Sequence, residues 1–336
     1  MNPSLTLTQI KAEAKRLGFS ACGAVRAGRV GAWRTKQYDE WLAQERHGTM
    51  DYLLRHAQLR TDPRLVVEGA RTIVMLALNY APQCLLPAEG YTLARYAYGQ
   101  DYHEVMKQRL RMLMLALHLQ EGEHGRVFCD TFPLDERYWA WRCGLGAWGR
   151  NSQFILQRAG SYHFLGGLLL TVDIDGINDN SNEEAEPRVE DICGKCHRCL
   201  DACPTGAIAK NQCFDATRCL SYLTIEYRGS LTNEVGRLMG KCFYGCDRCA
   251  EVCPHNHNAC PSTEKAFLPS PKLLEMQTAD WEQLTPQRYQ EIFKGSAVKR
   301  AKFEGLQRNI QAIQQALSIK EKGESPKIQE ETTHSS

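Results

Sequence analysis

Eleven of the fifteen cysteines in this 336-residue chain fall between Cys193 and Cys260. A dense disulfide framework would be typical of a short secreted protein. The first 25 residues carry charges at Lys11 and Glu13 and lack the long apolar core of an export signal. The crowding of cysteines therefore predicts metal ligation in this segment.

The first cysteine motif, CGKCHRCLDACP, begins at Cys193 and has the C-x2-C-x2-C-x3-C-P spacing of bacterial ferredoxins. In that pattern the first three thiolates bind one [4Fe–4S] cluster and the fourth binds the other cluster. Zinc sites more often show two separated pairs of cysteines. The spacing predicts that Cys193, Cys196 and Cys199 bind one cluster and that Cys203 binds a second.

The second motif, CFYGCDRCAEVCP, supplies Cys246, Cys249 and Cys253 but has Phe243 where a regular repeat would place its first cysteine. By the same crossing pattern, Cys253 completes the first cluster, and the second cluster then lacks a fourth ligand. Spacing leaves four candidates for that ligand: Cys213, Cys219, Cys242 and Cys260. Two clusters that share their motifs in this way form a path for electrons, so we expect the chain to deliver electrons to a redox partner or substrate.

The rest of the chain shows the periodicity of a mixed α and β protein. Before residue 176, the predicted strands are 72–78, 126–129 and 164–173. The predicted helices are 103–120 and 136–149. Strands separated by helices predict an α/β domain. We therefore divide the chain into an α/β domain (1–176), a bacterial ferredoxin-like domain (177–262), a short helical region (263–317) and a disordered tail (318–336).

Net charge, hydropathy and missing motifs argue against several classes of function. The net charge of +2 gives no global field for nucleic acid or membrane binding, although a local basic patch remains compatible with it. The most apolar stretch, 164–172, is too short to span a bilayer. The chain has no GxGxxG or Walker motif for a dinucleotide or ATP. We expect a cytoplasmic protein.

Six motifs occur in an order that is characteristic of one family. They are LRTDPR (59–64), ARYAYGQDYH (94–103), CDTFPLDERYWAWRCGLGAWGRNS (129–152), CLSYLTIEYRGSL (219–231), MGKCFYGCDRCAEVCPHN (239–256) and FKGSAVKRAKFEGLQRN (293–309). This set resembles the epoxyqueuosine reductase family, whose members are cobalamin-dependent iron–sulfur enzymes of tRNA modification. The resemblance covers about residues 1–315 and implies an N-terminal cobalamin-binding domain followed by the two-cluster domain.

The resemblance also implies a reaction. Epoxyqueuosine at the wobble position of a tRNA anticodon loses its epoxide oxygen to give queuosine and water, with cob(I)alamin supplied with electrons by the two clusters. Asp130 matches the family's proton donor, a role that suits a carboxyl group whose pKa burial raises toward neutrality. Asp135 and Glu136 are local alternatives. Arg137 is expected to form an ion pair or to steer phosphate.

The family pattern places the missing cluster ligand just before SYLTIE, at Cys219. The first cluster would then be bound by Cys193, Cys196, Cys199 and Cys253. The second would be bound by Cys203, Cys219, Cys246 and Cys249. The resemblance thus implies that Cys213, Cys242 and Cys260 are not ligands.

Electrons must reach the cobalt, so the corrinoid is expected to lie against the second cluster. Besides Asp130, the candidate cobalamin contacts are Ser221, Asp247 and Arg248, with Arg60 and Gln153 from matching family positions. Family members bind cobalamin without a protein histidine on cobalt. His103 and His163 are accordingly expected to be structural or to contact substrate.

A basic segment near the C-terminus is the expected tRNA contact. Its cations are Lys294, Lys299, Arg300, Lys302 and Arg308, and Arg228 is expected to join them. Lys and Arg neutralise phosphates without reading sequence. On one helix, 299–302 would partly share a face. A charge run is often only a solvated surface, and the implied tRNA substrate favours RNA contact here. An external electron donor and a monomeric state complete the expectation.

Some positions depart from the family pattern. They are Phe132, Cys143, Arg150, Cys242 and Arg248. Two other classes of protein fit part of the sequence pattern: a corrinoid iron–sulfur reductase of the dehalogenase type, and a two-cluster electron carrier without catalytic activity. A dehalogenase would usually carry a twin-arginine signal, and a carrier would not need the N-terminal motifs.

Overall fold

The computed structural model describes residues 5–87, 89–177, 186–209 and 214–321. At its centre is a four-stranded sheet in the order β1 (Ala21–Arg26), β2 (Thr72–Asn79), β7 (His163–Leu170) and β4 (Gly125–Phe128). All three pairings are antiparallel. The strands predicted in this region are confirmed to within a few residues, but the helices between them do not serve as crossovers between parallel strands.

The central strand β2 is buried on both faces. Ile73, Met75 and Ala77 belong to the core on one side of the sheet. Val74, Leu76 and Leu78 belong to the core on the other side. Because side chains alternate between faces along a strand, an unbroken apolar run is what a strand covered on both sides requires.

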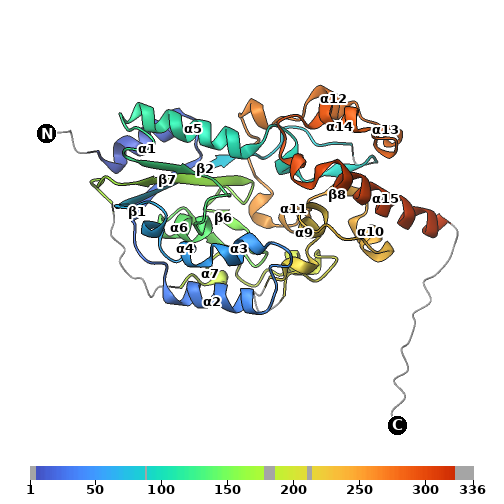
Figure 1. The fold of residues 1–336 in the computed structure, drawn as a ribbon, viewed down its shortest axis with the longest axis horizontal. Helices are drawn as coiled ribbons and strands as arrows, with labels where there is room; N and C mark the ends of the chain where they lie inside the picture. Colours follow the sequence, from blue (N-terminus) through green and yellow to red (C-terminus); the bar gives the residue numbers. More distant parts are fainter. Residues whose placement is uncertain (1–4, 88, 178–185, 210–213, 322–336) are drawn as a thin grey trace, which may run out of the picture.

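Helices α1 (Leu7–Arg16) and α5 (Tyr102–Ala116) cover one face of the sheet, above it in Figure 1. A capping box between Thr6 and Gln9 begins α1. The predicted helix 103–120 ends earlier, at Ala116, because the chain turns into a positive φ of 57° at His118. Asp101 caps the N-terminus of α5, a position that matters for the site described below.

The opposite face is covered by α6 (Glu136–Arg142) and a hairpin of β5 (Gly146–Trp148) and β6 (Phe154–Leu156). The helix predicted over 136–149 is therefore too long. It ends because Gly144 adopts a φ of 74°, which breaks the helical path. Further from the sheet lie α2 (Ala32–Ala43), α3 (Asp51–Arg55) and α4 (Ala57–Arg60).

The cysteine-rich segment consists of short elements. They are α7 (Val189–Cys193), α8 (Arg198–Asp201), α9 (Leu220–Ile225), α10 (Asn233–Met239), β8 (Cys242–Tyr244) and α11 (Arg248–Glu251). Strand β8 pairs in parallel with β3 (Thr92–Leu93) from the N-terminal part. Single 3₁₀ turns are η1 (Pro63–Leu65), η2 (Arg95–Ala97), η3 (Ala216–Arg218), η4 (Pro254–Asn256) and η5 (Lys265–Phe267).

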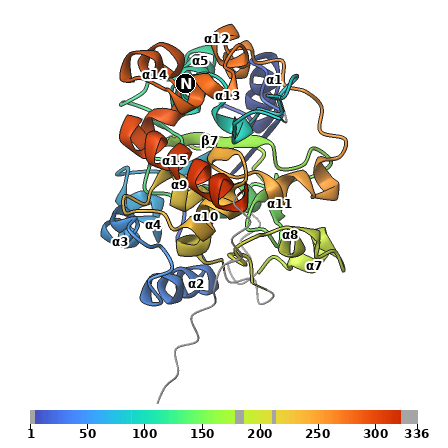
Figure 2. The same cartoon turned by 90° about the vertical axis from the view of Figure 1, so that its right-hand side faces the viewer.

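The C-terminal region is helical, as predicted. It contains α12 (Pro271–Leu274), α13 (Thr278–Glu282), α14 (Pro286–Phe293), the 3₁₀ turn η6 (Ala297–Ala301) and α15 (Lys302–Glu321). In Figure 2, α15 lies across the front, with α12 and α7 at opposite edges of the molecule. Helix α15 continues through 318–321, and the remainder of the predicted disordered tail, 322–336, lies outside the described residues.

The domain boundary expected at residue 176 does not divide the chain into two separately packed units. Leu93, Ala97 and Tyr98 belong to the same core as Phe243 and Trp281. The segment around β3 therefore completes the hydrophobic core under the cysteine-rich and C-terminal parts. Part of the predicted linker, 178–185, lies outside the described residues. No helix in the described ranges is long and apolar enough to cross a membrane.

Candidate active site

A cavity of about 910 Å³ lies between the sheet domain and the cysteine-rich segment. Its lining includes five of the six residues predicted to contact a cofactor: Arg60, Asp130, Gln153, Ser221 and Asp247. The sixth, Arg248, is not part of this lining, and its guanidinium lies beside Gly240 at the end of α10. Arg248 is the first residue of α11, and its contact with a cofactor stays a prediction.

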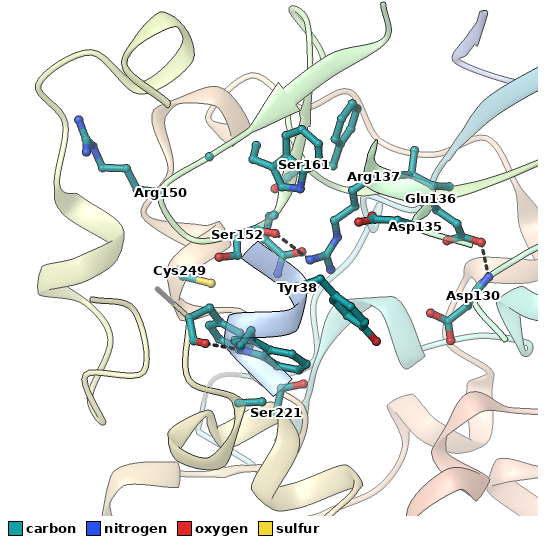
Figure 3. Close-up of a pocket in the computed structure, with 18 of the residues that line it drawn as sticks. Tyr38, Asp130, Asp135, Glu136, Arg137, Arg150, Ser152, Ser161, Ser221 and Cys249 are labelled. Carbon is teal, nitrogen blue, oxygen red and sulfur yellow. Dashed lines mark hydrogen bonds between the residues drawn. The ribbon is translucent and has the colours of Figure 1, made fainter. Parts of the chain in front are cut away.

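The wall formed by the cysteine-rich segment contains Cys246 and Cys249, two predicted ligands of the second cluster. Figure 3 shows Cys249 and Asp130 on opposite sides of the cavity, with Tyr38 between them in this view. The cavity therefore separates a predicted electron source from a carboxyl group. A substrate bound within it can be reached from both sides.

The structure brings the predicted ligands of the first cluster together. Burial, and then the neighbouring Cys193 thiolate, raises the pKa of Cys199 to about 11, and Cys253 and Cys196 add to the effect. Cys253 likewise interacts with Cys193 and Cys196. The crossing of Cys253 from the second motif to the first group is thus reproduced in space.

The predicted ligands of the second cluster form the neighbouring group. Cys219 interacts electrostatically with Cys203, and Cys246 with Cys219. Cys249 interacts with Cys246 and Cys219. Within the described ranges, no three such side chains converge tightly enough for a single metal ion. In a four-iron cluster each cysteine binds a different iron, so its ligands do not need to converge on one ion.

The remaining cysteines of the dense segment differ from these eight. Cys242 also lies near Cys246, but its thiol is within hydrogen-bonding distance of the Tyr244 and Gly245 carbonyls, at 3.6 and 3.5 Å. Cys260 is exposed. Cys213 lies outside the described residues.

Asp130 follows β4 and projects into the cavity, with 57% of its side chain exposed there. Its φ is 53°, a left-handed conformation that is uncommon for a non-glycine residue. Its backbone amide donates a hydrogen bond to Glu136. Its carboxylate Oδ2 lies 3.0 Å from Nε2 of His103, which sits in the first turn of α5.

The protonation expected from the sequence is not what the surroundings of Asp130 favour. The enclosing walls favour the neutral acid, but the hydrogen bond and charge of His103 lower the pKa of Asp130 below its usual value. Burial alone would lower the pKa of His103, yet its hydrogen bonds to Asp101 and Asp130 raise it to about 9. These shifts favour a protonated His103 beside an ionised Asp130.

The two local alternatives to Asp130 are distinguished by their partners. Asp135 caps α6 and receives a 2.7 Å ion pair from Arg34, which keeps its pKa low against the effect of burial. Burial, and then the charge of Asp130, raises the pKa of Glu136 to about 8. Asp135 is thus a structural anion, whereas Glu136 is neutral near pH 7.

Sequence reasoning missed the aromatic wall supplied by α2. Trp33, Gln37 and Trp41 all line the cavity. Their spacing of four residues places them on one face of a helix, and this pattern was the available signal. Trp33 Nε1 and His163 Nδ1 have no hydrogen-bond partner within the described ranges, and both residues line the cavity. Flat walls and unsatisfied buried nitrogens suit a large, planar, polar-edged ligand.

The basic segment is arranged differently from the single helix expected. Residues 297–301 form η6, and Lys302, the first residue of α15, has a φ of 61°. Lys294, Lys299 and Lys302 are exposed. Arg300 pairs with Glu226 through two hydrogen bonds of 2.8 and 2.7 Å.

Two further arginines of the predicted tRNA contact support the main chain. Arg228 donates to the Ile225 and Arg300 carbonyls. Arg308 donates to the Leu223, Tyr227 and Gly229 carbonyls. These bonds fix η6 and α15 against α9, so Arg308 has a structural role.

Two family models match the chain. Residues 60–131 match the model described as "Epoxyqueuosine reductase QueG, DUF1730", and residues 192–256 match a 4Fe-4S double cluster binding domain. The epoxyqueuosine reductase of Cyclobacterium marinum is 40% identical over 312 residues, which cover 92% of this chain and 97% of that protein. The chain belongs to the epoxyqueuosine reductase family. The predicted membership is confirmed, and the cysteine-rich segment is a domain for two [4Fe–4S] clusters.

Other members of the epoxyqueuosine reductase family agree. The Escherichia coli protein is 34% identical, with 92% of this chain and 82% of that protein covered. The Streptococcus thermophilus epoxyqueuosine reductase structure superposes with a TM-score of 0.77 at 26% identity, covering 95% of this chain and 86% of that one. A crystal structure of epoxyqueuosine reductase with a tRNA-Tyr epoxyqueuosine-modified stem loop gives 0.74 at 25%, with coverages of 93% and 80%.

Proposed function

We propose that this protein reduces epoxyqueuosine to queuosine in the anticodon loop of tRNA. Membership in the epoxyqueuosine reductase family supports the activity. The observation that carries the mechanism is the cavity that has Asp130 on one wall and Cys246 and Cys249 on another. Removal of the epoxide oxygen consumes two electrons and two protons and releases one water. Electrons would enter from the cluster side and protons from the Asp130 side.

We assign the cluster ligands as two sets of four thiolates. The first set is Cys193, Cys196, Cys199 and Cys253, and the second is Cys203, Cys219, Cys246 and Cys249. Most of the electrostatic contacts fall within a set and support this division, while the interaction of Cys249 with Cys199 joins the two neighbouring sets. Because Cys246 and Cys249 line the cavity, the second cluster would be the one that reduces the molecule bound in the cavity. An external electron donor would reduce the first cluster.

The cavity is proposed to bind a cobalamin. When bound, a reduced corrinoid supplies the electrons that break the carbon–oxygen bond. Arg60, Gln153, Ser221 and Asp247 offer polar contacts, and the aromatic wall of α2 offers flat apolar surface. His163 would not serve as a cation, since burial lowers its pKa to about 4. Its neutral ring and Trp33 Nε1 provide partners for polar groups at the edge of the ligand.

The tRNA would approach over η6 and α3. The Arg300 guanidinium lies over the ring of Tyr52, 5.8 Å from the ring centroid. The charge of Asp130 contributes to the raised pKa of both residues. The exposed Lys294, Lys299 and Lys302, together with Arg300 and Arg228, are proposed to contact the phosphates around the anticodon loop. The wobble base would leave its stack and enter the cavity, as single-stranded RNA recognition usually requires.

The test is conversion of a defined substrate. The anaerobic protein, carrying its clusters and cob(II)alamin, is reduced with dithionite and mixed with an epoxyqueuosine-containing anticodon stem loop, and nucleosides are measured by mass spectrometry. Queuosine should appear at one per two electrons consumed. Failure of the loaded and reduced protein to form queuosine contradicts the proposal. A dehalogenase-type activity would instead give halide release from an aryl halide.

A further inference from the structure

A second carboxylate stands behind the pair formed by His103 and Asp130. His103 Nδ1 lies 2.7 Å from Oδ1 of Asp101, and its Nε2 lies 3.0 Å from Oδ2 of Asp130. The three side chains therefore form a line from the N-terminus of α5 to the cavity. Asp130 lines the cavity, and His103 is reached through it.

Hydrogen bonds and ring stacking fix the position of the His103 imidazole. The Asp101 carboxylate accepts a 3.0 Å hydrogen bond from the His103 amide as the cap of α5, and the Asp101 amide donates to the Gly295 carbonyl. The His103 ring stacks on Tyr102 at 4.0 Å, and Tyr102 stacks on Phe164 at 4.2 Å. Only 21% of the His103 side chain is exposed. This arrangement holds the tautomer and orientation of the ring and keeps bulk water from most of it.

Asp130 alone cannot supply the protons that the reaction consumes. Two protons must reach one oxygen atom in each turnover, and Asp130 is held as a carboxylate in the resting protein. A carboxylate cannot donate until it receives a proton. The group in direct hydrogen-bonding contact with its Oδ2 is His103.

We propose that His103, held between Asp101 and Asp130, is the positioning residue that stores the proton which Asp130 passes to the departing oxygen. The inference rests on the proposed function, in which Asp130 is the donor. As the carbon–oxygen bond breaks, the His103 proton moves to the Asp130 carboxylate and from Asp130 to the oxygen, which leaves Asp130 a carboxylate again and His103 a neutral imidazole. Water then reprotonates the pair through the open cavity, and the same route delivers the second proton. The two electrons come from the donor through the clusters.

Other charged groups face this pair, and they do not replace His103. The titratable and charged groups are Tyr52, Tyr96, Asp101, Tyr102, Lys107, Cys129, Glu136, Arg137 and Arg300. The Tyr102 side chain also hydrogen-bonds Asp130, but burial raises the pKa of Tyr102 well above its ordinary value, so Tyr102 does not release a proton near neutral pH. Glu136 is the strongest rival because it too retains a proton near neutral pH. The Glu136 carboxyl group accepts a hydrogen bond from the Asp130 amide and not from the Asp130 carboxyl group. Glu136 therefore fixes the backbone of Asp130 and lacks the direct contact that His103 has.

The first test is a pH profile of single turnover in the reduced, loaded protein. His103→Gln keeps a hydrogen-bond donor toward Asp130 but cannot store a proton. The wild-type rate should stay level up to about pH 9, whereas the variant rate should fall about tenfold per pH unit from below neutrality, where a free carboxyl group titrates. His118→Gln, the same change at the exposed far end of α5, should match wild type. A His103→Gln profile that matches wild type overturns the proposal.

The second test does not depend on turnover. Deuterium exchange at the imidazole C2 position, followed by mass spectrometry across a pH series, reports the pKa of His103 in the intact protein. We expect a midpoint near pH 9 that falls by more than one unit in Asp130→Asn. An unchanged midpoint overturns the coupling. If wild type forms no queuosine, the proposed function fails; if wild type is active, Asp130→Asn is inactive and His103→Gln behaves as wild type, only this inference fails.

Discussion

The backbone amide of Arg95 donates a 2.6 Å hydrogen bond to the carboxylate of Asp247. Arg95 belongs to the N-terminal part of the chain, and Asp247 lies between two predicted ligands of the second cluster. The Arg95 guanidinium also bonds the Tyr162 hydroxyl at 2.9 Å and Glu251 at 2.8 Å. This contact aligns the cluster wall of the cavity with the sheet domain that carries Asp130.

Removal of the Asp247 carboxylate should weaken that alignment. Asp247→Ala leaves the Arg95 amide without its partner inside the protein, at a cost of about 1–3 kcal/mol in the free energy of unfolding. Glu251→Ala is the matched control, because it removes a partner of the same arginine at a more exposed position, where an ion pair contributes about 1 kcal/mol or less. Urea unfolding under anaerobic conditions compares the two. Equal losses would contradict the role given to Asp247.

The ligand assignment separates Cys219 from Cys242, which spacing alone did not. Cys219→Ala should lose one cluster, about four of the eight irons per chain. Cys242→Ala should retain both, because its thiol contacts backbone carbonyls. Iron analysis and the electron paramagnetic resonance of the reduced protein measure this. Loss of a cluster in Cys242→Ala with full occupancy in Cys219→Ala would reverse the assignment.

Glu136 and His103 should both make the stability of the protein fall as pH rises from about 5 to 9, whereas His163, whose pKa burial lowers to about 4, acts in the opposite sense up to its ordinary value of 6.5. Glu136 has a folded-state pKa of about 8 against an ordinary value of 4.5, and His103 about 9 against 6.5. Each group binds its proton more tightly in the folded chain, so its stabilisation is complete below the ordinary pKa and is lost as pH rises through the folded-state value. Asp130, whose pKa is lowered, acts in the opposite sense, below this window.

Glu136→Gln isolates one part of this dependence. Gln keeps an oxygen for the Asp130 amide but does not ionise, so the slope of stability between pH 5 and 8 should decrease. The change above pH 8 that belongs to His103 should remain. Glu234→Gln, at an exposed helix position, provides the control. Urea midpoints across the pH series measure the slopes, and a slope that Glu136→Gln leaves unchanged would count against a buried, protonated Glu136.

The exposed lysines beside η6 should bind RNA through phosphates. Lys299→Ala should weaken binding of the stem loop at low salt and reduce the slope of log K against log salt by about 1. Lys272→Ala, on α12 away from η6, should leave both unchanged. Fluorescence anisotropy over a salt series measures the slope. A Lys299→Ala slope equal to that of wild type would remove Lys299 from the interface.

The metal-binding part of the site was largely readable from sequence, because thiolate spacing within a ferredoxin motif is a local property. The strand at 72–78 was equally readable, since a run of apolar residues buried on both faces leaves little choice. Asp130 was identified only through family resemblance. Its own spacing suits a turn as well as an acid.

The proton arrangement was not readable from sequence. His103 and Asp130 are 27 residues apart, and their contact depends on the packing of α5 against the sheet. The pKa of Asp130 lies below its usual value because His103 stands beside it, a neighbour that the sequence did not reveal. Arg248 does not line the cavity although its sequence neighbour Asp247 does, and its contact with a cofactor stays a prediction.

Electrons and protons are proposed to meet on one substrate between the cluster wall and Asp130. The decisive experiment is single turnover by the reduced, cobalamin-loaded Asp130→Asn variant, with both clusters verified by iron content and spectra. Asn keeps the shape of the side chain but has no acidic proton. We predict that queuosine formation falls to about 1% of wild type or less, in line with the 10²–10⁴-fold contribution of general acid catalysis. Turnover at the wild-type rate would contradict the account.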